Sequence, residues 1–357
     1  MTKDPSAGRT DLGDLDDRAG EILKSVIQSH VITGEPVGSR TLSRGAGLDL
    51  SPATIRNVMS DLEERGLLSQ PHASAGRVPT DLAYRIYVDR LMPRPPIDVG
   101  HAQAIDEALQ QRRGEIPELL GEAARQLSRV SQHVGVVLVP DMRRIVVEHL
   151  EFVRLDAHRV VAILVDRSGV VHNRILAVKD AFDQPDLDRV GRELSQRFSG
   201  QTLPTIREAI ARELIEEQSA YDRRRARLLE LGRDALEVDE DASGVLVEGA
   251  SNLVGALEFN DIERTKELLR TLEQKGRLVD LLESVLTGQG VQVVIGHENP
   301  VSSLSDLSVV ATTYRAGERV LGTVGIVGPT RMEYARAIAL VDYLAHVLTR
   351  FLTNAGA

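Results

Sequence analysis

The segment 51–64 has polar side chains at the spacing of a helix that reads nucleic acid. A helical period of about 3.6 residues places Ala53 and Asn57 on one side of such a helix, with Thr54 and Arg56 on its flanks. Small side chains let a helix backbone enter the DNA major groove, where amide and guanidinium groups can pair with base edges. The pattern favours a recognition helix in which Thr54, Arg56 and Asn57 contact bases or adjacent sugars, although a solvated helix face would show the same residue types.

Groups suited to phosphate contacts surround this segment. The backbone N–H groups that follow Ser51 are free at a helix start, where the helix dipole also attracts an anion. The helical segment before it and the loop after it contribute hydroxyl, imidazole and guanidinium groups at Ser39, Arg40, Arg44, His72, Ser74 and Arg77. We expect Ser51 and these residues to position the DNA backbone rather than to read its sequence.

Several of these residues also have a structural explanation. Arg40 and Arg44 could instead form surface ion pairs with Glu63 or Glu64. His72 could be an ordinary residue of a polar loop. The sequence leaves these alternatives open, but DNA-compatible groups on four neighbouring elements favour a nucleic-acid-binding domain.

Motifs for catalysis or metal binding are missing from the sequence. The nine histidines form no HExxH pattern and no close pair at metal-ligand spacing, and the chain has no cysteine. Gly288 and Gly290 open only a partial dinucleotide motif, which leads into an apolar run instead of following one. No GxSxG nucleophile motif occurs either. We therefore expect no enzyme activity, no cofactor and no metal site.

Caps and periodicity predict the elements that position the polar residues. Apolar residues recur at helical spacing from Arg18 until Gly34, and a short helix is predicted over 38–44. Ser51 is a good capping residue, and Pro52 suits the first position of a third helix. The third helix has an apolar stripe at helical spacing, formed by Ile55, Val58, Met59 and Leu62.

A hairpin and a fourth helix complete this region. An extended stretch begins at Leu67, a turn-rich loop follows, and the chain returns at Val78. A further helix is predicted from Thr80 to about Met92. Three helices followed by a hairpin predict a winged helix-turn-helix unit over residues 18–94, which a stiff PRPP sequence separates from the rest.

The rest of the chain predicts an interrupted sheet. After a linker helix within residues 95–132, residues 205–287 have mostly helical periodicity. Val- and Ile-rich runs typical of strands occur on both sides of that block, near residues 134–139, 145–152, 159–165, 170–178, 291–295, 307–314 and 320–327. We therefore expect an α+β fold in which residues 133–204 and 288–353 form one mixed-sheet domain, interrupted by a helical insertion at 205–287.

Charge is uneven along the chain. With 43 basic and 53 acidic residues among 357, the net charge is −10, which repels phosphate overall. Residues 18–94 nevertheless hold 10 basic and 8 acidic side chains, whereas residues 205–287 hold 12 basic and 19 acidic ones. Much of the acidic excess therefore lies in the insertion, outside the expected DNA-binding unit.

The first residues, the cysteine content and the apolar stretches of the chain indicate where in the cell the protein acts. Residues 1–17 are rich in Asp, Gly, Ser and Thr, and we expect a disordered leader. The absence of cysteine fits a reducing compartment, so we expect a cytoplasmic protein. No apolar stretch has the length of a signal-peptide core or a membrane span, and we expect no membrane contact.

Separated motifs resemble one protein family. The run GEPVGSRTLSRGAGLDLSPATIRNVMSDLEERGLLSQPHASAGRVPTDLAYRIYVD at residues 34–89 is similar to the HrcA family of heat-inducible transcription repressors. VVIGHENP at 293–300, DLSVVATTY at 306–314 and VGIVGPTRMEYARAIALVDYLAHVL at 324–348 resemble the C-terminal signature of that family. The similarity spans residues 17–353, and the motifs occur in the family's order.

The resemblance implies a homodimeric repressor that binds double-stranded DNA at the inverted repeat CIRCE upstream of chaperone operons. It also implies loss of activity on heating and a partner, the chaperonin GroEL, that keeps the repressor active. The implied architecture is a winged helix, a GAF-like sheet domain and an inserted dimerisation domain. Val58, Ala83 and Ile86 depart from the family pattern, which concerns local packing more than DNA contact.

Two other functions fit the residues. A GAF-like domain could bind a metabolite and move the DNA-binding units, although aromatic residues make up only 3% of the chain and no polar cluster converges there. Alternatively, the acidic insertion could bind partners in a scaffold or chaperone adaptor that does not touch DNA. A thermal shift with a metabolite would favour the first function, and failure to bind any palindromic DNA would favour the second.

Overall fold

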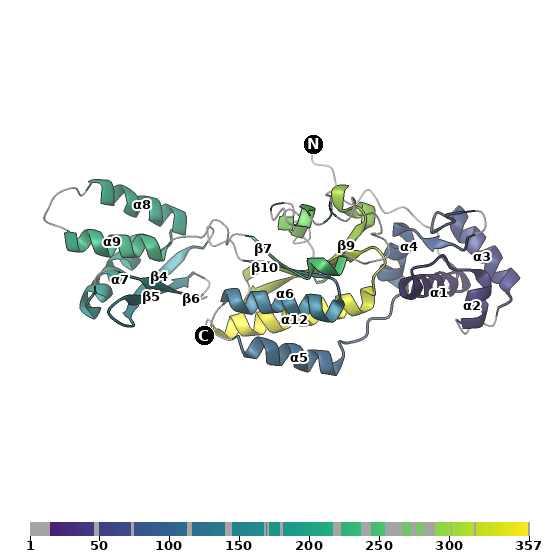
Figure 1. Ribbon diagram of the computed structural model, residues 1–357, viewed down its shortest axis with the longest axis horizontal. Helices are drawn as coiled ribbons and strands as arrows, with labels where there is room; N and C mark the ends of the chain where they lie inside the picture. The colour runs from purple at the N-terminus through teal and green to yellow at the C-terminus, as the bar shows by residue number, and fades with distance from the viewer. Residues whose placement is uncertain are drawn as a thin grey trace.

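The computed structural model describes residues 15–45, 50–72, 75–112, 116–139, 145–167, 169, 171–178, 181–216, 223–236, 244–253, part of 266–282, 290–300, 302–317 and 319–355. The N-terminal helices lie at one end of an elongated molecule, a sheet lies in the middle, and a second sheet lies at the other end (Figure 1). Most of the leader expected to be disordered, residues 1–14, lies outside the described residues.

The N-terminal unit consists of helices and a two-stranded hairpin in the predicted order. Its elements are α1 (Asp17–Thr33), α2 (Ser39–Gly45), α3 (Pro52–Glu64), β1 (Leu68–Ser69), β2 (Val78–Pro79), α4 (Asp81–Ile86) and the π-helical turn η1 (Tyr87–Leu91). Strands β1 and β2 pair antiparallel, with Leu68 opposite Pro79. Helix α1 begins one residue before the predicted start, because the Asp16 side chain accepts a hydrogen bond from the Ala19 N–H and caps it.

An apolar core joins these helices, as the sequence pattern predicted. Ile55, Met59 and Leu62 of α3 are at most 1% exposed. Val58 packs against the same cluster but is only partly buried. Helix α1 contributes Ile22, Leu23, Val26 and Ile27 to the cluster. Each fully buried aliphatic side chain stabilises such a unit by about 1.5–3 kcal/mol, so the α3 stripe fixes which side of the helix faces outward.

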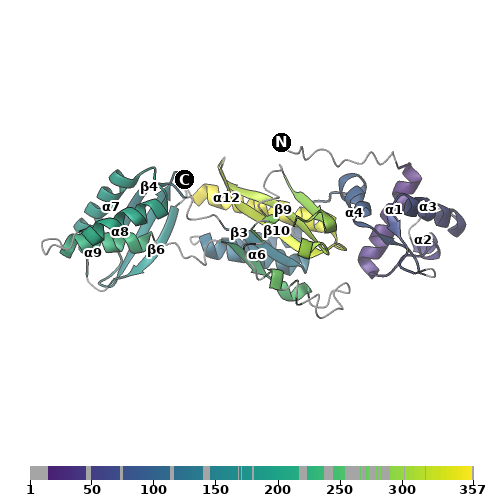
Figure 2. The ribbon, with the colours of Figure 1, turned by 90° about the horizontal axis from the view of Figure 1, so that it is seen from above.

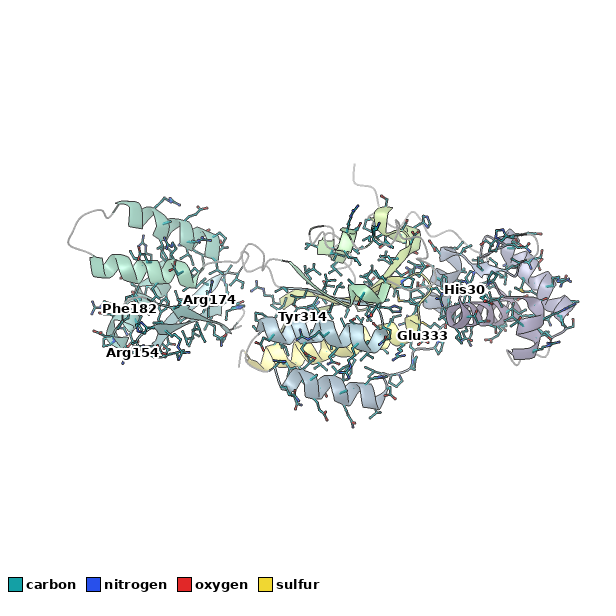
Figure 3. The ribbon with its side chains drawn as sticks, in the orientation of Figure 1. His30, Arg154, Arg174, Phe182, Tyr314 and Glu333 are labelled. Atoms are coloured by element: carbon teal, nitrogen blue, oxygen red, sulfur yellow. The ribbon has the colours of Figure 1, made fainter. Side chains whose placement is uncertain are left out.

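A five-stranded sheet forms the centre of the molecule, in the order β7-β3-β10-β9-β8. Its strands are β3 (Val134–Leu138), β7 (Val245–Glu248), β8 (Gln292–Ile295), β9 (Leu307–Ala316) and β10 (Arg319–Pro329). The pairings between them are all antiparallel, so the expectation of a mixed sheet was wrong. Tyr314 of β9, labelled in Figure 3, donates a buried hydrogen bond of 2.9 Å to the Leu138 carbonyl of β3. Burial raises the pKa of the Tyr314 hydroxyl far above its ordinary value, so this donor stays protonated.

The linker helix expected within residues 95–132 is instead two helices of the central unit. They are α5 (Val99–Gln110) and α6 (Ile116–Ser131). Helix α6 covers one face of the sheet together with α12 (Tyr334–Ala355), and α5 packs against these two helices (Figures 1 and 2). Leu120, Ala123 and Leu127 of α6 are 0% exposed. The sequence reveals such an apolar face but not the sheet that covers it, which is why these helices were expected to form a linker.

The second sheet corrects the predicted domain boundaries. Strands β4 (Val147–Arg154), β5 (Arg159–Asp166) and β6 (Val171–Ala177) form a separate sheet, which packs with α7 (Gln184–Phe198), α8 (Leu203–Glu216) and α9 (Arg223–Ala235) around its own apolar core. The insertion therefore spans 145–236, not 205–287, and most of 133–204 lies outside the central sheet. Strand β7, which sequence periodicity had assigned to the helical block, returns the chain to that sheet.

The close approach of Gly76 to the loop between α1 and α2 gives a stability prediction. A Cβ atom at residue 76 would lie 2.5 Å from the backbone carbon and oxygen of Val37. Gly76→Ala should lower the free energy of unfolding of the N-terminal unit by about 1–3 kcal/mol, because backbone atoms must move to admit the methyl group. Urea unfolding of the full chain followed by circular dichroism measures the change.

Gly45→Ala is the matched control, since a Cβ atom at residue 45 meets nothing within 4 Å. Equal stability of the two variants would contradict the close approach at Gly76.

Candidate nucleic-acid interface

Helix α3 starts sharply at its exposed end. The Ser51 hydroxyl accepts a hydrogen bond of 3.1 Å from the Thr54 N–H and lies 2.9 Å from the Thr54 hydroxyl. Pro52 occupies the first turn, where the missing N–H costs nothing. Ser51, Pro52 and Ala53 are all exposed, so the start of the helix is open to an anion. Ser51 therefore has a structural role as the cap, in addition to the predicted phosphate contact.

The outer face of α3 presents the two groups best suited to base edges. Arg56 and Asn57 are both exposed, on the side opposite the buried stripe. Neither side chain has a hydrogen-bond or ion-pair partner among the residues that the structure describes. An amide and a guanidinium group free of intramolecular bonds keep their full capacity to pair with DNA.

Helix α2 presents two of its three predicted phosphate contacts. Arg40 and Arg44 are exposed, and within the described part of the chain neither forms an ion pair. The alternative that they pair with Glu63 or Glu64 is therefore not realised. Ser39 is only 8% exposed. This burial leaves little of the Ser39 side chain exposed and disfavours the predicted phosphate contact.

Arg77 has a different role from the one predicted. Its Nε donates a hydrogen bond of 2.8 Å to Oε2 of Glu63, and the Arg77 side chain is only 16% exposed. The backbones of Arg77 and Val37 exchange two hydrogen bonds of 2.9 Å. Arg77 thus ties the base of the hairpin to α3 and to the loop before α2, and little of its side chain remains exposed for the predicted phosphate contact.

The hairpin loop is partly described. His72 is exposed, and its carbonyl accepts a hydrogen bond of 2.8 Å from the Ala75 N–H. Ser74, which was predicted to contact DNA, lies outside the described residues. Gln70 donates a hydrogen bond of 2.9 Å from its amide to the Ala75 carbonyl. Sequence reasoning did not single out Gln70, and it considered Glu63 only as a partner of Arg40 or Arg44. A polar residue flanking a short hairpin and an acidic residue near its base were the available signals.

Together these elements form a surface that can bind a polyanion. Exposed guanidinium groups on α2 and α3, a capped helix start and an imidazole lie on one small unit at the end of the molecule (Figure 1). In the described residues, no cluster of three or more His, Asp or Glu side chains could hold a metal ion. None of the described helices is both long and apolar enough to span a membrane.

The chain has relatives along almost its whole length. The family model of the HrcA protein C terminal domain matches residues 117–338. Proteins named heat-inducible transcription repressor HrcA from Geobacter sulfurreducens and Xanthomonas axonopodis pv. citri are each 40% identical to it; the first match covers 95% of this chain and 98% of the relative, and the second covers 96% and 97%. The repressor of that name from Desulforamulus reducens is 38% identical over 95% of this chain and 97% of its own length.

A solved structure of a hypothetical protein has the same fold. It superposes with a TM-score of 0.70 at 21% sequence identity, and the match covers 96% of this chain and 100% of that one. This likeness concerns the fold alone.

The class of protein follows from these observations. An exposed basic helical unit, carried at one end of a chain whose relatives are repressors over nearly their full length, defines a transcription repressor, and such a protein binds DNA. The family match over 117–338 and the 40% identity to repressors of known family are decisive for the narrower assignment: the chain belongs to the HrcA family of heat-inducible transcription repressors.

The Arg77–Glu63 contact gives a prediction about the hairpin. Arg77→Ala and Glu63→Ala should each destabilise the unit, and a double-mutant cycle should show a coupling of about 1 kcal/mol because the two side chains bond each other. Urea unfolding of the wild type, both single variants and the double variant measures the coupling. Additive effects, with a coupling near zero, would contradict the structural role assigned to Arg77.

Proposed function

We propose that this protein is a dimeric repressor that reads an inverted-repeat operator of the CIRCE type with α3 in the major groove of each half-site. The observation that carries the proposal is the exposed face of α3, where Arg56 and Asn57 have no partner among the described residues. A two-fold dimer on a palindrome doubles its contacts and fixes the distance between half-sites, so dimerisation and specificity are coupled. Three helices and a hairpin support a winged helix-turn-helix as the reading unit.

The proposed contacts divide into two groups. Thr54, Arg56 and Asn57 read bases or adjacent sugars, because they lie on or beside the outer face of α3. The backbone phosphates are held by Arg40, Arg44, Ser51, His72 and Ser74. Arg77 supports this surface indirectly by holding the hairpin against α3.

The homodimer is proposed to form through the insertion. Its central strand β5 buries one face against the helices, yet Val161, Ile163 and Val165 on the other face remain partly exposed. The neighbouring strand β6 adds Ile175, which is 61% exposed and pairs opposite Val161, and Val171, which is 39% exposed and pairs opposite Val165. An uncovered apolar sheet face of this kind is typical of a protein interface, and a second copy of the same face is its proposed occupant.

The response to heat is proposed to depend on marginal stability. A few degrees change the free energy of unfolding of such domains by about 1 kcal/mol, which alters occupancy when the reserve is small. We propose that the chaperonin GroEL restores the folded repressor, and that heating releases chaperone operons when the chaperonin is occupied. The relatives' printed name, heat-inducible transcription repressor, supports this regulation.

Footprinting of the purified protein on chaperone promoters tests operator and partner together. We expect protection of an inverted repeat, lost after mild heating and restored by chaperonin with ATP. If no repeat is protected at low salt, the proposed operator is overturned. If DNA binding recovers fully on cooling without chaperonin, the proposed role of the chaperonin is overturned.

Asn57 should carry sequence specificity. Asn57→Ala should weaken binding to the inverted repeat by about 1–3 kcal/mol and leave binding to random DNA almost unchanged, because the variant loses only a side-chain contact to a base edge. Fluorescence anisotropy with both DNAs measures the specificity ratio.

Two further variants complete this experiment. Arg40→Ala should weaken binding to both DNAs and reduce the salt slope by about one unit, as loss of a phosphate contact requires. Gln103→Ala, at an exposed amide residue of α5 outside both the N-terminal unit and the proposed dimer face, is the control of matched residue type. If Asn57→Ala kept the wild-type preference for operator over random DNA, the assignment of Asn57 to base reading would be wrong.

The insertion face should control the oligomeric state. Ile175→Asp should shift the dimer toward monomer, because a carboxylate would be buried in an apolar interface, and the sedimentation coefficient measured by ultracentrifugation should fall. Val320→Asp, at a 40% exposed apolar position of the central sheet, is the matched control. An unchanged dimer in Ile175→Asp would exclude this face from the interface.

A further inference from the structure

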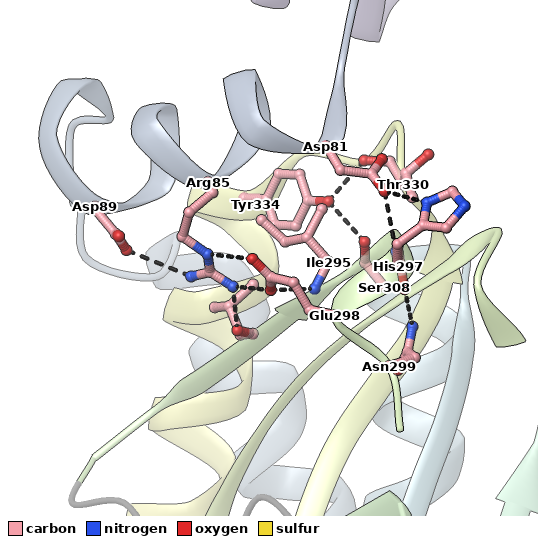
Figure 4. Close-up of polar contacts among 12 residues, drawn as sticks. Asp81, Arg85, Asp89, Ile295, His297, Glu298, Asn299, Ser308, Thr330 and Tyr334 are labelled. Carbon is pink, nitrogen blue, oxygen red and sulfur yellow. Dashed lines mark hydrogen bonds and ion pairs between the residues drawn. The ribbon is translucent and has the colours of Figure 1, made fainter. Parts of the chain in front are cut away.

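Two sequence motifs that are far apart in the chain meet in one interdomain contact. Asp81 and Arg85, from helix α4 of the N-terminal unit, lie against the turn that follows β8 (Figure 4). Oδ2 of Asp81 accepts a hydrogen bond of 2.9 Å from the backbone N–H of His297 and lies 2.8 Å from Nδ1 of the His297 ring. Arg85 donates from Nε to Glu298 Oε1 at 2.8 Å, and a second guanidinium nitrogen bonds Oε2 of the same carboxylate. We call these four side chains the α4 joint.

The turn is built to receive α4. Gly296 has a φ of +52°, and a Cβ atom there would lie 2.1 Å from Oδ2 of Asp81. The buried Asn299 amide donates to the carbonyls of Gly296, Leu304 and Leu307 at distances of 2.6–2.9 Å, which fixes the turn. Glu298 is itself held, because its Oε2 accepts a hydrogen bond of 2.8 Å from the Ile295 N–H. The receiving side of the joint is therefore held by hydrogen bonds that do not involve Arg85.

Further contacts hold the same two units beside the joint. The rings of Tyr84 and Tyr334 pack with centroids 5.8 Å apart, and the Tyr84 hydroxyl is 2.9 Å from Nδ1 of His30. Arg331, on the approach to α12, donates a hydrogen bond of 2.6 Å to the Val31 carbonyl near the end of α1. His30 and Glu333, labelled in Figure 3, lie on the two sides of this boundary. Apolar contacts hold the units together, and the polar bonds restrict their relative rotation.

Hydrogen bonds and neighbouring charges favour the ionised form of the joint, against the effect of burial. Burial lowers the pKa of Arg85, but the hydrogen bonds and charge of Glu298, with Asp89, outweigh it and leave that pKa raised. The hydrogen bond and charge of Asp81 raise the pKa of His297 above its ordinary value, and Asp306 adds to this. The Asp81–His297 pair is therefore fully formed while His297 is protonated and weakens as the pH rises through that raised pKa.

We propose that the α4 joint is the element that sets which half-site spacing the dimer accepts. The inference rests on the proposed function, in which two reading helices contact one inverted repeat. Their separation is fixed only if each N-terminal unit keeps one orientation on its central sheet. A bidentate guanidinium–carboxylate pair has a defined geometry, unlike an apolar contact, and can supply that orientation. Asp81, Arg85, His297 and Glu298 are thus positioning residues that do not touch DNA.

A panel of operators with identical half-sites and different spacers tests the joint in the full-length protein. When the spacer changes by about half a helical turn, or about 5 base pairs, we expect wild-type affinity to fall about tenfold or more. In Arg85→Ala and in Glu298→Ala the fall should shrink to about twofold, because the freed unit can reorient. Affinity for a single half-site should be unchanged in both variants.

Three more variants make the result decisive. Arg85→Lys keeps the positive charge but cannot form the bidentate pair, so it should lose spacing selectivity as Arg85→Ala does, which a role of charge alone would not predict. Arg90→Ala, at an exposed arginine of η1, is the matched control and should behave as the wild type. Asp81→Asn changes no volume and serves if the alanine variants do not fold; it should reduce selectivity and lower the His297 pKa seen by NMR.

The outcomes separate this inference from the proposed function. A wild-type protein that binds no inverted repeat at any spacing overturns the proposed function, and the role of the joint with it. If the wild type is selective for half-site spacing and the folded Arg85→Ala and Asp81→Asn variants are equally selective, the role of the joint is overturned and the proposed function stands. Equal tightening on every spacer in the variants would mean that the joint opposes DNA binding, which also overturns the inference.

Discussion

One apolar cluster runs without a break from the N-terminal unit into the central sheet, and the placement of helix α3 depends on it. Ile55 of α3, Tyr84 of α4, Tyr334 of α12 and Val310 of β9 all belong to this cluster. Apolar attraction is strong but has no direction, so it holds two units together without choosing the angle between them. Direction comes from polar groups at the edge of the cluster, where Arg85 and Glu298 bond each other. The unit that meets DNA therefore has a defined place on the body of the protein.

The basic surface of an acidic protein depends on how its charges are paired. The chain has a net charge of −10, yet the arginines on the outer sides of α2 and α3 have no acidic partner among the described residues. Glu63 bonds Arg77 at 2.8 Å and is not paired with these arginines. The contact that fixes the hairpin therefore engages Glu63 with Arg77 alone among the arginines of this unit that the structure describes.

The insertion is a separate structural unit with its own apolar core, distinct from the cluster that links the other two units. Asp166, 2% exposed, lies 3.6 Å from Arg319 at the near end of the central sheet and connects the two across their boundary. A unit with an independent core can contact a second copy without disturbing the reading head at the far end of the molecule. In the proposed dimer, this arrangement would separate dimer formation from DNA reading in space.

Local features of the chain were readable from the sequence because their causes lie within a few residues. Ser51 with Pro52 predicted the start of α3, and the stripe at Ile55, Met59 and Leu62 predicted its buried side, which left Asn57 and Arg56 facing outward. Partners distant in sequence were not readable. The strand pattern of Val160 to Val165 is the same whether β5 joins the central sheet or a separate one, so the insertion was misplaced. Likewise, the local sequence around Arg77 would be the same whether its side chain contacted a phosphate or bonded Glu63.

Sequence determined the helices, the hairpin and the outer face of α3, since hydrogen bonds and side-chain periods within one segment set these. Only the tertiary structure decided which strands share a sheet, that Ser39 is buried, that Arg77 bonds Glu63 and that Arg85 bonds Glu298. These features depend on contacts between segments that are distant in sequence.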